Sequence, residues 1–337
     1  MEKPQVAIVG GESLRGRELR DVLQYSTLGG RVKLVGGVDQ AVLTEQGGEA
    51  AVMEPLEGDA LGGARLVFLA GTPVSSQKAL EMVGRSKHPA AVIDLTHTLE
   101  DDPRAQVRAP SAEPADWKAP PGNVFVIAHP AAIAIAVFLR KLAERHRMRR
   151  VVAQVLEPAS ERGQVGIEEL QRQTLNLLSF QKLPQQVFDA QLGFNLLVRY
   201  GSDAPEPLEA VEQRIDRHLS LLLGRGGDIP MPSFRLAQAP VFHGYSFSVW
   251  VEFENNPGVE TLARDLTGPG IEVRSPDVEP PTNVSAAGHG EVTVGVIEID
   301  RNCPAAAWFW IVADNLRLAA ENAVAVARAV VLRDTVQ

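Results

Sequence analysis

A glycine-rich stretch near the amino terminus is the first segment whose residue types and spacing could do chemistry. The sequence GGESLRG occupies residues 10–16, between a short apolar run and a helical pattern. Glycines at a strand-to-helix turn let the backbone approach a pyrophosphate at the amino terminus of the helix. Ser13 stands at the middle glycine position, where its side chain takes part of the phosphate's space but could also hydrogen-bond to it. The pattern predicts a dinucleotide site formed by Gly10, Gly11, Ser13, Leu14 and Gly16; a tight turn without a ligand is the alternative.

An aspartate lies where such a domain reads the ribose of its cofactor. Asp39 follows the second apolar run, about 20 residues beyond the turn. An acidic side chain there accepts from the ribose 2′-hydroxyl and repels a 2′-phosphate. If a cofactor binds, Asp39 favours NAD over NADP, and the alternative is an ordinary loop aspartate.

Thiol and imidazole groups are few. Cys303 is the single cysteine, which excludes an intrachain disulfide and a cysteine-cluster metal site. His129, His243 and His289 do not have the spacing of metal ligands. The sequence therefore predicts no bound metal.

The elements that must position these groups alternate between strand and helix in the first part of the chain. Apolar runs cover residues 5–9, 33–38, 64–70, 90–95 and 124–128, and helical spacing begins at Leu14. Repeated strand–helix units build a parallel sheet covered by helices. Residues 101–121 are rich in Pro and Asp and predict a loop.

The pattern changes after residue 128. A helix is predicted over residues 129–146, with Pro130 in its first turn. Alternation predicts strands of a mostly antiparallel sheet over residues 150–156, 234–254, 291–300 and 306–313. Helices are predicted over residues 166–180, 208–222, 259–266 and 315–332. We therefore expect an α/β protein, with a Rossmann-like domain of residues 1–128 plus 316–337 and a second α+β domain of residues 129–315.

Composition limits the partners. The net charge is −9 and the pI about 5.4, which argues against a broad nucleic-acid surface. The amino terminus lacks the pattern of a signal peptide, and the longest apolar stretch, residues 131–139, is too short to span a bilayer. The sequence predicts a soluble, cytoplasmic protein without nucleic-acid or membrane partners.

Seven segments together resemble one family across nearly the full length. They are GGESLRG at 10–16, VFLAGTPVS at 67–75, VIDLTHT at 92–98, VIAHPAAIAIA at 126–136, Phe194-Asn195, PVFHGYSFSVWVE at 240–252 and VADNLRLAAENAVAVA at 312–327. The chain resembles the aspartate-semialdehyde dehydrogenases of amino-acid biosynthesis, and most of all their divergent Usg-type members, which have no established reaction. The resemblance adds Gly71 to the expected cofactor site and implies NAD or NADP as the cofactor.

The resemblance also implies a reaction. In the family a cysteine attacks the semialdehyde, a histidine takes the proton, hydride passes to NADP, and phosphate releases an acyl phosphate. Arginines hold the substrate carboxylate and the phosphate, since guanidinium groups grip such anions bidentately.

These roles are largely lost in this chain. The nucleophile position falls on Ala132 and the base position on Tyr245, whose unperturbed pKa is about 10. The phosphate-holding arginine falls on Glu100 and the carboxylate-holding arginine on Gln238. The arginine-serine pair that reads the NADP phosphate falls near Asp39-Gln40. We therefore expect no intact catalytic set.

Some family positions are retained. Gln154, Asn195, Glu212 and Arg214 match the resembled family. Gln154 is the one of these that we keep as a catalytic candidate.

Other residues could substitute for the lost groups. His243 precedes Tyr245 by two residues and would share its face on a strand. His129 at a helix start and His97 after a core strand could face the crevice. Structural roles are the alternative for all three histidines, and Cys303, in a predicted turn, is expected to be a bystander.

Three hypotheses remain open. The first is a degenerate homologue that retains the fold, the dimer and a site for NAD or NADP, and that binds an unknown small molecule or protein. The second is an active NAD(P)-dependent oxidoreductase acting on an aldehyde or related small molecule without a thioacyl intermediate, with Tyr245 or His243 as proton donor. The third is a true aspartate-semialdehyde dehydrogenase with its catalytic residues elsewhere. Because the second domain forms the dimer in the resembled family, we expect a homodimer anchored by aromatic residues, namely Trp250, Trp308, Phe309 and Trp310.

Overall fold

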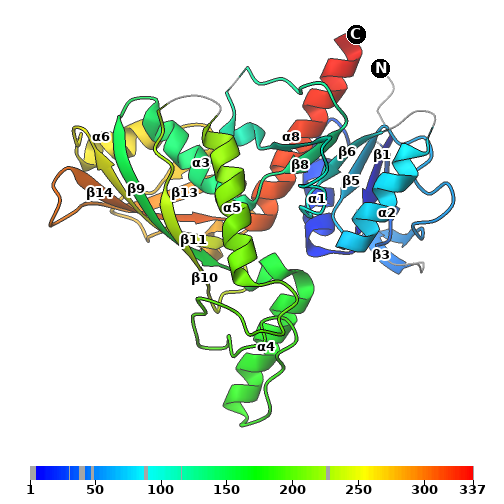
Figure 1. Cartoon of the computed structure of the whole chain (residues 1–337), viewed down its shortest axis with the longest axis horizontal. Helices are drawn as coiled ribbons and strands as arrows, with labels where there is room; N and C mark the ends of the chain where they lie inside the picture. The colour runs from blue at the N-terminus through cyan, green and yellow to red at the C-terminus, as the bar shows by residue number, and fades with distance from the viewer. Residues whose placement is uncertain are drawn as a thin grey trace. The chain divides into compact units, whose positions relative to one another are not determined.

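The chain forms two compact units (Figure 1). The computed structural model describes residues 5–29, 31–37, 42–46, 49–86, 90–114, 116–224 and 228–336. One unit comprises Met1–Ala128 with Ala319–Gln337, and the other His129–Leu318; we call them the N-terminal unit and the central unit. Asp39, the predicted ribose-reading residue, lies outside the described residues.

A parallel sheet forms the core of the N-terminal unit, with strand order β2-β1-β5-β6-β8-β7. Its strands are β1 (Gln5–Val9), β2 (Arg31–Val35), β5 (Leu66–Leu69), β6 (Ala91–Asp94), β7 (Ala105–Arg108) and β8 (Val124–Ile127). Every neighbouring pair is parallel. β5, β6 and β8 are buried throughout, as expected for strands covered on both faces. The predicted Rossmann-like fold is confirmed.

Helices and a small hairpin complete this unit. The helices are α1 (Leu14–Gln24), α2 (Pro73–Gly84), the 3-10 turn Pro110–Ala112 and most of α8 (Asn315–Val336), which begins in the central unit. β3 (Val42–Gln46) pairs antiparallel with β4 (Glu49–Met53). The loop predicted for residues 101–121 is wrong in part, because it contains β7. This edge strand pairs with β8 alone, and its residues AQVR carry little apolar signal.

The central unit contains a six-stranded mixed sheet of order β10-β9-β11-β14-β13-β12. Its strands are β9 (Met148–Glu157), β10 (Ser233–Gln238), β11 (Tyr245–Phe253), β12 (Ile271–Val273), β13 (Val292–Ile299) and β14 (Ala306–Ala313). The four inner strands pair antiparallel, and only the edge strands β10 and β12 pair parallel. The predicted mostly antiparallel sheet is confirmed. The single strand predicted over 234–254 is wrong: a turn with Gly244 at φ +80° separates β10 from β11.

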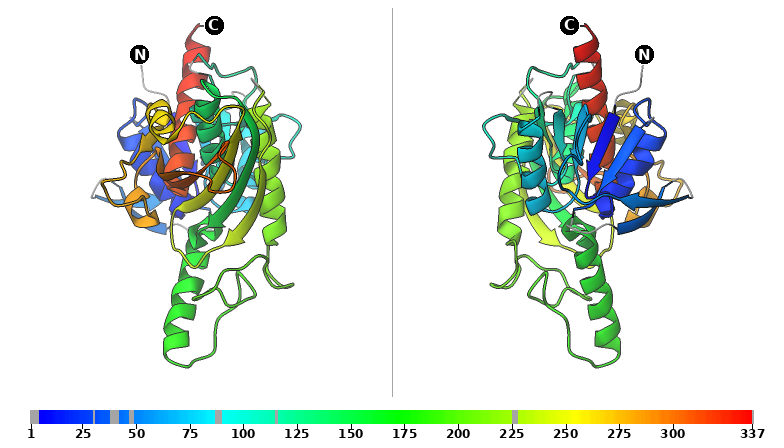
Figure 2. Two further views of the ribbon diagram at one scale, coloured as in Figure 1. Left: turned by 90° about the vertical axis from the view of Figure 1, so that its left-hand side faces the viewer. Right: turned by 90° about the vertical axis from the view of Figure 1, so that its right-hand side faces the viewer.

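Helices cover one face of this sheet. They are α3 (Pro130–Ala143), α5 (Leu208–Leu223) and α6 (Val259–Leu266), while α4 (Gly163–Leu178) follows the 3-10 turn Ala159–Arg162, and α7 (Asn283–Ala286) is short. The ring of Phe138 on α3 packs edge-on against Phe309 on β14, with centroids 5.0 Å apart. α4 projects away from the sheet within this unit, as Figures 1 and 2 show. Among the described residues, no helix is both long and apolar enough to cross a bilayer.

Candidate functional site

The predicted dinucleotide turn is built on close backbone contacts. Gly10 has φ +80°, and a Cβ added there would lie 2.2 Å from the Cα of Gly71. A Cβ on Gly16 would lie 2.3 Å from the carbonyl oxygen of Gly10. These positions therefore accept only glycine, because the ends of β1 and β5 meet the start of α1 without room for a side chain. The structure brings Gly10, Gly16 and Gly71 together as one turn.

The side chain of Ser13 forms hydrogen bonds within this turn. It is the N-cap of α1, and its hydroxyl accepts from the Gly16 N–H at 2.9 Å. The same hydroxyl donates to the carbonyl oxygen of Ala70 at 2.6 Å. Since a hydroxyl has one proton to donate, Ser13 gives that proton to the protein rather than to an approaching phosphate.

A carboxylate that the sequence did not single out lies at the same turn. The Oε1 atom of Glu12 accepts from the backbone N–H of Gly37 at 2.9 Å, just beyond the end of β2. The Oε2 atom of Glu12 is buried, and no hydrogen-bond partner reaches it among the residues that the structure describes. The signal that could have found Glu12 is its position inside the glycine-rich motif.

The VIDLTHT segment owes its shape to one buried carboxylate. Asp94 accepts from the Thr96 N–H at 2.7 Å, the Thr96 hydroxyl at 2.6 Å and the Leu99 N–H at 2.9 Å. Burial raises the pKa of Asp94, and these hydrogen bonds oppose the rise. His97 sits in the turn with φ +61° and is buried, and Glu100 follows it. Asp94 therefore organises the turn that carries Glu100.

In the central unit, the position that the resemblance assigns to the nucleophile is buried at the start of α3. His129 is the N-cap, and its Nδ1 accepts from the Ala131 N–H at 3.3 Å. Its own backbone N–H donates to Nδ1 of His218 at 2.9 Å. His129 is 1% exposed and Ala132 is fully buried. His129 thus has a capping role here, and Ala132 presents only a methyl group.

Tyr245 is equally enclosed. It is fully buried, stacks on Phe247 with centroids 5.6 Å apart, and meets the His129 ring edge-on at 6.0 Å. Its hydroxyl donates to Oε2 of Glu157 at 3.2 Å. Burial, followed by the charge of Glu157, raises the pKa of Tyr245 well above its ordinary value. A buried phenol in this state, which already donates to a carboxylate, is unsuited to act as a general base.

Glu157 links Tyr245 to a buried polar network. Arg162 donates to Oε1 of Glu157 at 3.0 Å and pairs on its other side with Glu206, which also binds Arg214 at 2.9 Å. Burial raises the pKa of Glu157 to about 7, and the charge of Arg162 opposes the rise. The Arg162 guanidinium is thus shared between two carboxylates of the same chain.

The resemblance places the substrate-holding arginine of the family at Gln238. It is fully buried, and its amide nitrogen donates to the carbonyl oxygens of Glu157 at 2.7 Å and Ala239 at 3.1 Å. Its amide oxygen accepts from the Tyr200 hydroxyl at 2.6 Å. Gln238 therefore closes the network instead of offering a positive charge to a ligand.

The other site residues that the sequence predicted in the central unit do not belong to the network around Glu157. Gln154 is exposed on β9, and its amide donates to the carbonyl oxygen of Arg235 at 3.2 Å. The amide of Asn195 donates to the carbonyl oxygen of Gln191, and Glu212 accepts from the Leu236 N–H. The strand geometry predicted for His243 is wrong, because β11 begins only at Tyr245 and Gly244 intervenes with φ +80°.

Cys303 is far from Tyr245. It is half-buried in the turn between β13 and β14, and its N–H donates to Asp300 at 3.0 Å. Tyr245 pairs with Ala313, whereas Glu252, seven residues further along β11, pairs with Ala306 next to this turn. At 3.3 Å per residue, the two ends are separated by about 23 Å. Among the described residues, no group of three or more His, Cys, Asp or Glu side chains is arranged for a metal.

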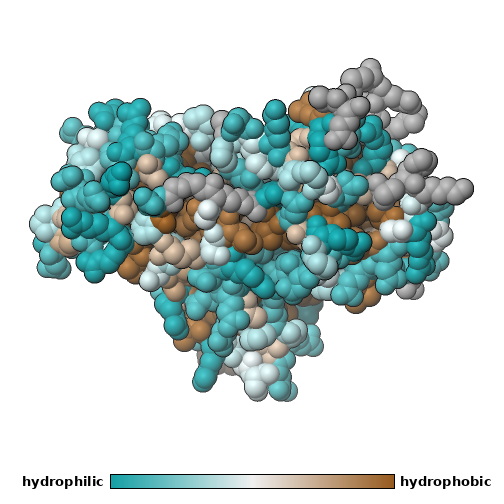
Figure 3. Space-filling model, turned by 45° about the horizontal axis from the view of Figure 1, so that its top comes forward, coloured by the Kyte–Doolittle hydropathy of each residue, from teal (hydrophilic) through white to brown (hydrophobic). Residues whose placement is uncertain are grey.

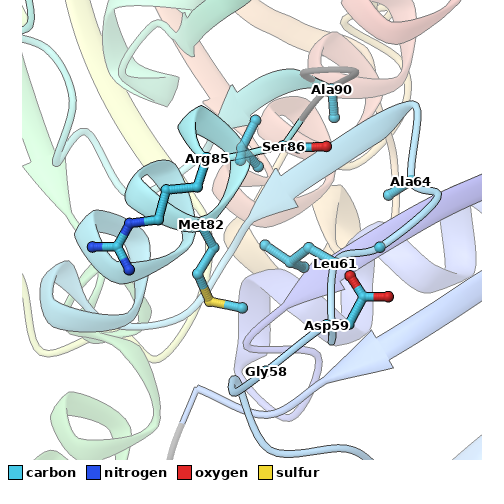
Figure 4. A pocket seen from close by; sticks show the side chains of 10 residues that line it. Gly58, Asp59, Leu61, Ala64, Met82, Arg85, Ser86 and Ala90 are labelled. Carbon is cyan, nitrogen blue, oxygen red and sulfur yellow. The ribbon is translucent and has the colours of Figure 1, made fainter.

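A separate cavity of about 210 Å³ lies in the N-terminal unit (Figure 4). It is lined by Gly58, Asp59, Leu61, Gly62, Ala64, Met82, Val83, Arg85, Ser86 and Ala90. Ala64 and Ala90 precede β5 and β6, so the cavity lies at the amino ends of these strands. Ligands of open α/β sheets bind at the carboxyl ends. In Figure 4 the Arg85 side chain extends away from Leu61 and Asp59.

Comparisons with known proteins cover both units. A family model of the semialdehyde dehydrogenase dimerisation domain matches residues 139–318. The chain is 33% identical to a USG-1 protein homolog of Pseudomonas aeruginosa over 241 residues. These residues cover 69% of this chain and 70% of that protein. It is 28% identical to the aspartate-semialdehyde dehydrogenase of Aquifex aeolicus, over 97% of this chain and 98% of that one. The solved structure of a probable aspartate-semialdehyde dehydrogenase from Pseudomonas aeruginosa superposes with a TM-score of 0.85 at 28% identity, covering 98% and 99% of the two chains.

Proposed function

Because the chain belongs to the aspartate-semialdehyde dehydrogenase family, we propose that it is a catalytically degenerate member that keeps the fold, the dimer and a nucleotide-binding turn. The observation that carries this proposal is the start of α3, where Ala132 is fully buried and His129 meets Tyr245 of a closed polar network. Its role is then to bind a small molecule or a protein partner. The single, half-buried thiol is compatible with a cytoplasmic location.

The thioacyl route needs a nucleophile, a base and cations that bind the carboxylate and the phosphate, and we propose that this chain has lost all of them. A covalent intermediate needs a nucleophile with a base within hydrogen-bond reach. Ala132 has no nucleophilic atom, and the Tyr245 hydroxyl already donates to Glu157. Gln238 and Glu100 provide no cation for carboxylate or phosphate. Loss of a nucleophile alone typically costs several orders of magnitude in rate.

The turn of the N-terminal unit fits a dinucleotide. Gly10, Gly16 and Gly71 keep the close approach of β1, β5 and α1 that brings a pyrophosphate to a helix amino terminus. Gly11 and Leu14 complete the backbone around it, and Ser13 is turned inward. When bound, the nicotinamide of NAD or NADP would supply a hydride acceptor.

The dimer is best explained by the open face of the central sheet. Trp250 on β11 pairs with Trp308 on β14 and, on its other side, with Val152 on β9. The side chain of Trp308 is 41% exposed and that of Val152 is 46% exposed. Both indole N–H groups donate to Asp300, so their polar atoms are satisfied and the rings present apolar surface. Apolar side chains also emerge among hydrophilic ones on the face shown in Figure 3. A second copy of the chain would cover these rings.

An active oxidoreductase without a thioacyl step is the weaker candidate. It requires a proton donor beside the substrate, and Tyr245 is fully buried with a raised pKa. His243 is half-buried in the turn before β11 and shares no strand face with Tyr245. Only the intact glycine turn favours this alternative.

The proposal is tested by intact-protein mass spectrometry. The purified protein is incubated with aspartate semialdehyde and either NAD or NADP, without phosphate, so that any acyl-enzyme accumulates. We expect the mass to stay unchanged, because Ala132 has no nucleophilic atom and the Tyr245 hydroxyl is buried and donates to Glu157. A stable acyl adduct that needs the oxidised cofactor and disappears in Cys303→Ala would overturn the proposal.

A further inference from the structure

We propose that an arm of the central unit, residues 163–199, completes the dimer by packing its apolar side chains on a second copy of the chain. The inference rests on the dimer of the proposed function and adds a second contact surface to the open sheet face. The arm consists of α4 and of the segment that follows it, residues 179–199, which we call the return segment. α4 projects from the sheet, and the return segment runs back beside it (Figures 1 and 2).

The open sheet face needs additional apolar surface to hold a dimer. A stable interface buries about 800 Å² per partner, more than half of it apolar. Trp308 and Val152 of that face are 41% and 46% exposed. Since even a large aromatic side chain has only about 250 Å² to bury, these two side chains together offer on the order of 200 Å².

The arm carries apolar surface of the required kind. Phe180, at the end of α4, is 99% exposed, and Val198 of the return segment is 78% exposed. The large apolar side chains that the arm exposes include Leu175, Leu178, Phe180, Phe194, Leu196 and Val198. Exposed apolar side chains gathered in this way mark interaction sites.

The return segment extends the open face of the sheet. Leu197 and Gln238 of β10 exchange two backbone hydrogen bonds, of 3.0 and 2.9 Å. Gln238 pairs in register with Glu157 of β9, and both are buried on the side that the helices cover. Paired residues share a face, whereas successive residues alternate, so Leu196 and Val198 turn toward the open face. Their surface is therefore continuous with the face that carries Val152.

Two buried side chains of α4 hold the return segment in place. The carboxylate of Glu169 accepts from the backbone N–H groups of residues 186–188 at 2.7–3.2 Å. The amide oxygen of Gln173 accepts from the N–H groups of residues 192 and 193 at 2.6 and 3.0 Å. The apolar side chains are thus presented on a fixed framework, which lowers the ordering cost when a partner binds.

The charge of the arm suits a contact between two copies. The chain as a whole carries a net charge of −9, so two copies repel each other over most of their surfaces. Residues 163–199 contain three acidic and three basic side chains and are neutral overall. The semialdehyde dehydrogenase dimerisation domain matches residues 139–318, which include both the arm and the sheet. In a twofold dimer each arm would meet the same surface of the other copy.

Sedimentation equilibrium of the full-length protein tests the inference, with circular dichroism as the check on folding. We expect the double variant Leu196→Ser/Val198→Ser to raise the Kd of the dimer at least about tenfold, because both side chains are lost from both copies. Tyr25→Ser removes a similarly exposed side chain from the N-terminal unit and should leave the Kd unchanged. In the unaltered protein, hydrogen exchange over residues 193–199 should slow as the protein concentration rises through the Kd.

The other outcomes separate the arm from the dimer itself. An unchanged Kd in the folded double variant, or exchange over residues 193–199 that is independent of concentration, overturns the arm contact while the dimer through the sheet face stands. If the double variant does not fold, the exchange measurement on the unaltered protein decides alone. If the unaltered protein is a monomer at high micromolar concentration, the dimer of the proposed function fails and the inference falls with it.

Discussion

Ala132 stands where the resemblance places the nucleophile of the family, so a substitution there tests the covalent route. Ala132→Cys should fold, because a thiol is small and apolar enough for this buried position. We expect it to restore no phosphate-dependent oxidation of aspartate semialdehyde, measured by NADPH or NADH formation. Tyr245 cannot serve as base, and Glu100 and Gln238 still provide no anion clamp. Full activity from this one change would show that the other losses matter little.

Glu157 makes stability depend on pH. Its pKa is raised from 4.5 to about 7, chiefly by burial. Between these values the folded protein keeps a proton that the unfolded chain loses, so the free energy of unfolding falls as pH rises through this window. Glu157→Gln removes that contribution. We expect the variant to gain up to about 3 kcal/mol relative to the unaltered protein between pH 4.5 and 7, as measured by urea denaturation.

The control for this prediction is an exposed glutamate of the same unit. Glu254→Gln also removes one carboxylate but has no buried partner. The change with pH that Glu157→Gln produces should exceed that of Glu254→Gln over the window. A pH-independent difference for Glu157→Gln would contradict the buried, proton-binding state of Glu157.

At the scale of elements, the meeting of β1, β5 and α1 depends on glycine. Gly10→Ala places a Cβ 2.2 Å from the Cα of Gly71 at a positive φ. We expect it to lower the free energy of unfolding by about 2 kcal/mol or more. Gly84→Ala, at the end of α2 with open space around it, should be neutral or stabilise by up to about 1 kcal/mol. Equal effects in chemical denaturation would contradict the close approach.

Elements with strong apolar patterns were the predictable ones. β14 and α6 begin and end where the sequence predicts them, because β14 is a mostly buried apolar run and α6 buries Leu262 and Leu266, one helical turn apart. The β3–β4 hairpin and β7 carry weaker patterns and depend on a neighbouring strand for pairing. The strand geometry predicted for His243 is wrong for a local reason, because the left-handed Gly244 separates His243 from β11, which begins at Tyr245.

At the scale of the whole molecule, the network around Glu157 could not be predicted. The pairing of β9 with β10 and β11 brings Glu157, Gln238 and Tyr245 together, and the other members, residues 162, 200 and 206, come from segments outside these strands. The sequence predicted that Tyr245 and Gln238 replace family residues, but not that they share partners. A glutamate that ends an apolar strand was the available signal.

We predict that the dimer forms through the open face of the central sheet, which carries Trp308 and Val152. Trp308→Glu or Val152→Glu places a charge among apolar side chains, so we expect monomers in analytical ultracentrifugation. Tyr25→Ser, at a position 83% exposed in the N-terminal unit, should leave the dimer unchanged. A folded dimer in both glutamate variants would place the interface elsewhere on the surface, where Phe180 and Val198, which follow α4, are also exposed.

The central claim is that this chain keeps the family fold without the family reaction, and a turnover assay tests it most directly. Purified protein is mixed with aspartate semialdehyde, phosphate and NAD or NADP, and reduced cofactor is followed at 340 nm, the wavelength of reduced nicotinamide. Because Ala132 and Tyr245 provide neither nucleophile nor base, we expect no turnover above the level of the Cys303→Ala protein. Phosphate-dependent turnover that copurifies with the protein and is abolished by Cys303→Ala would contradict the claim.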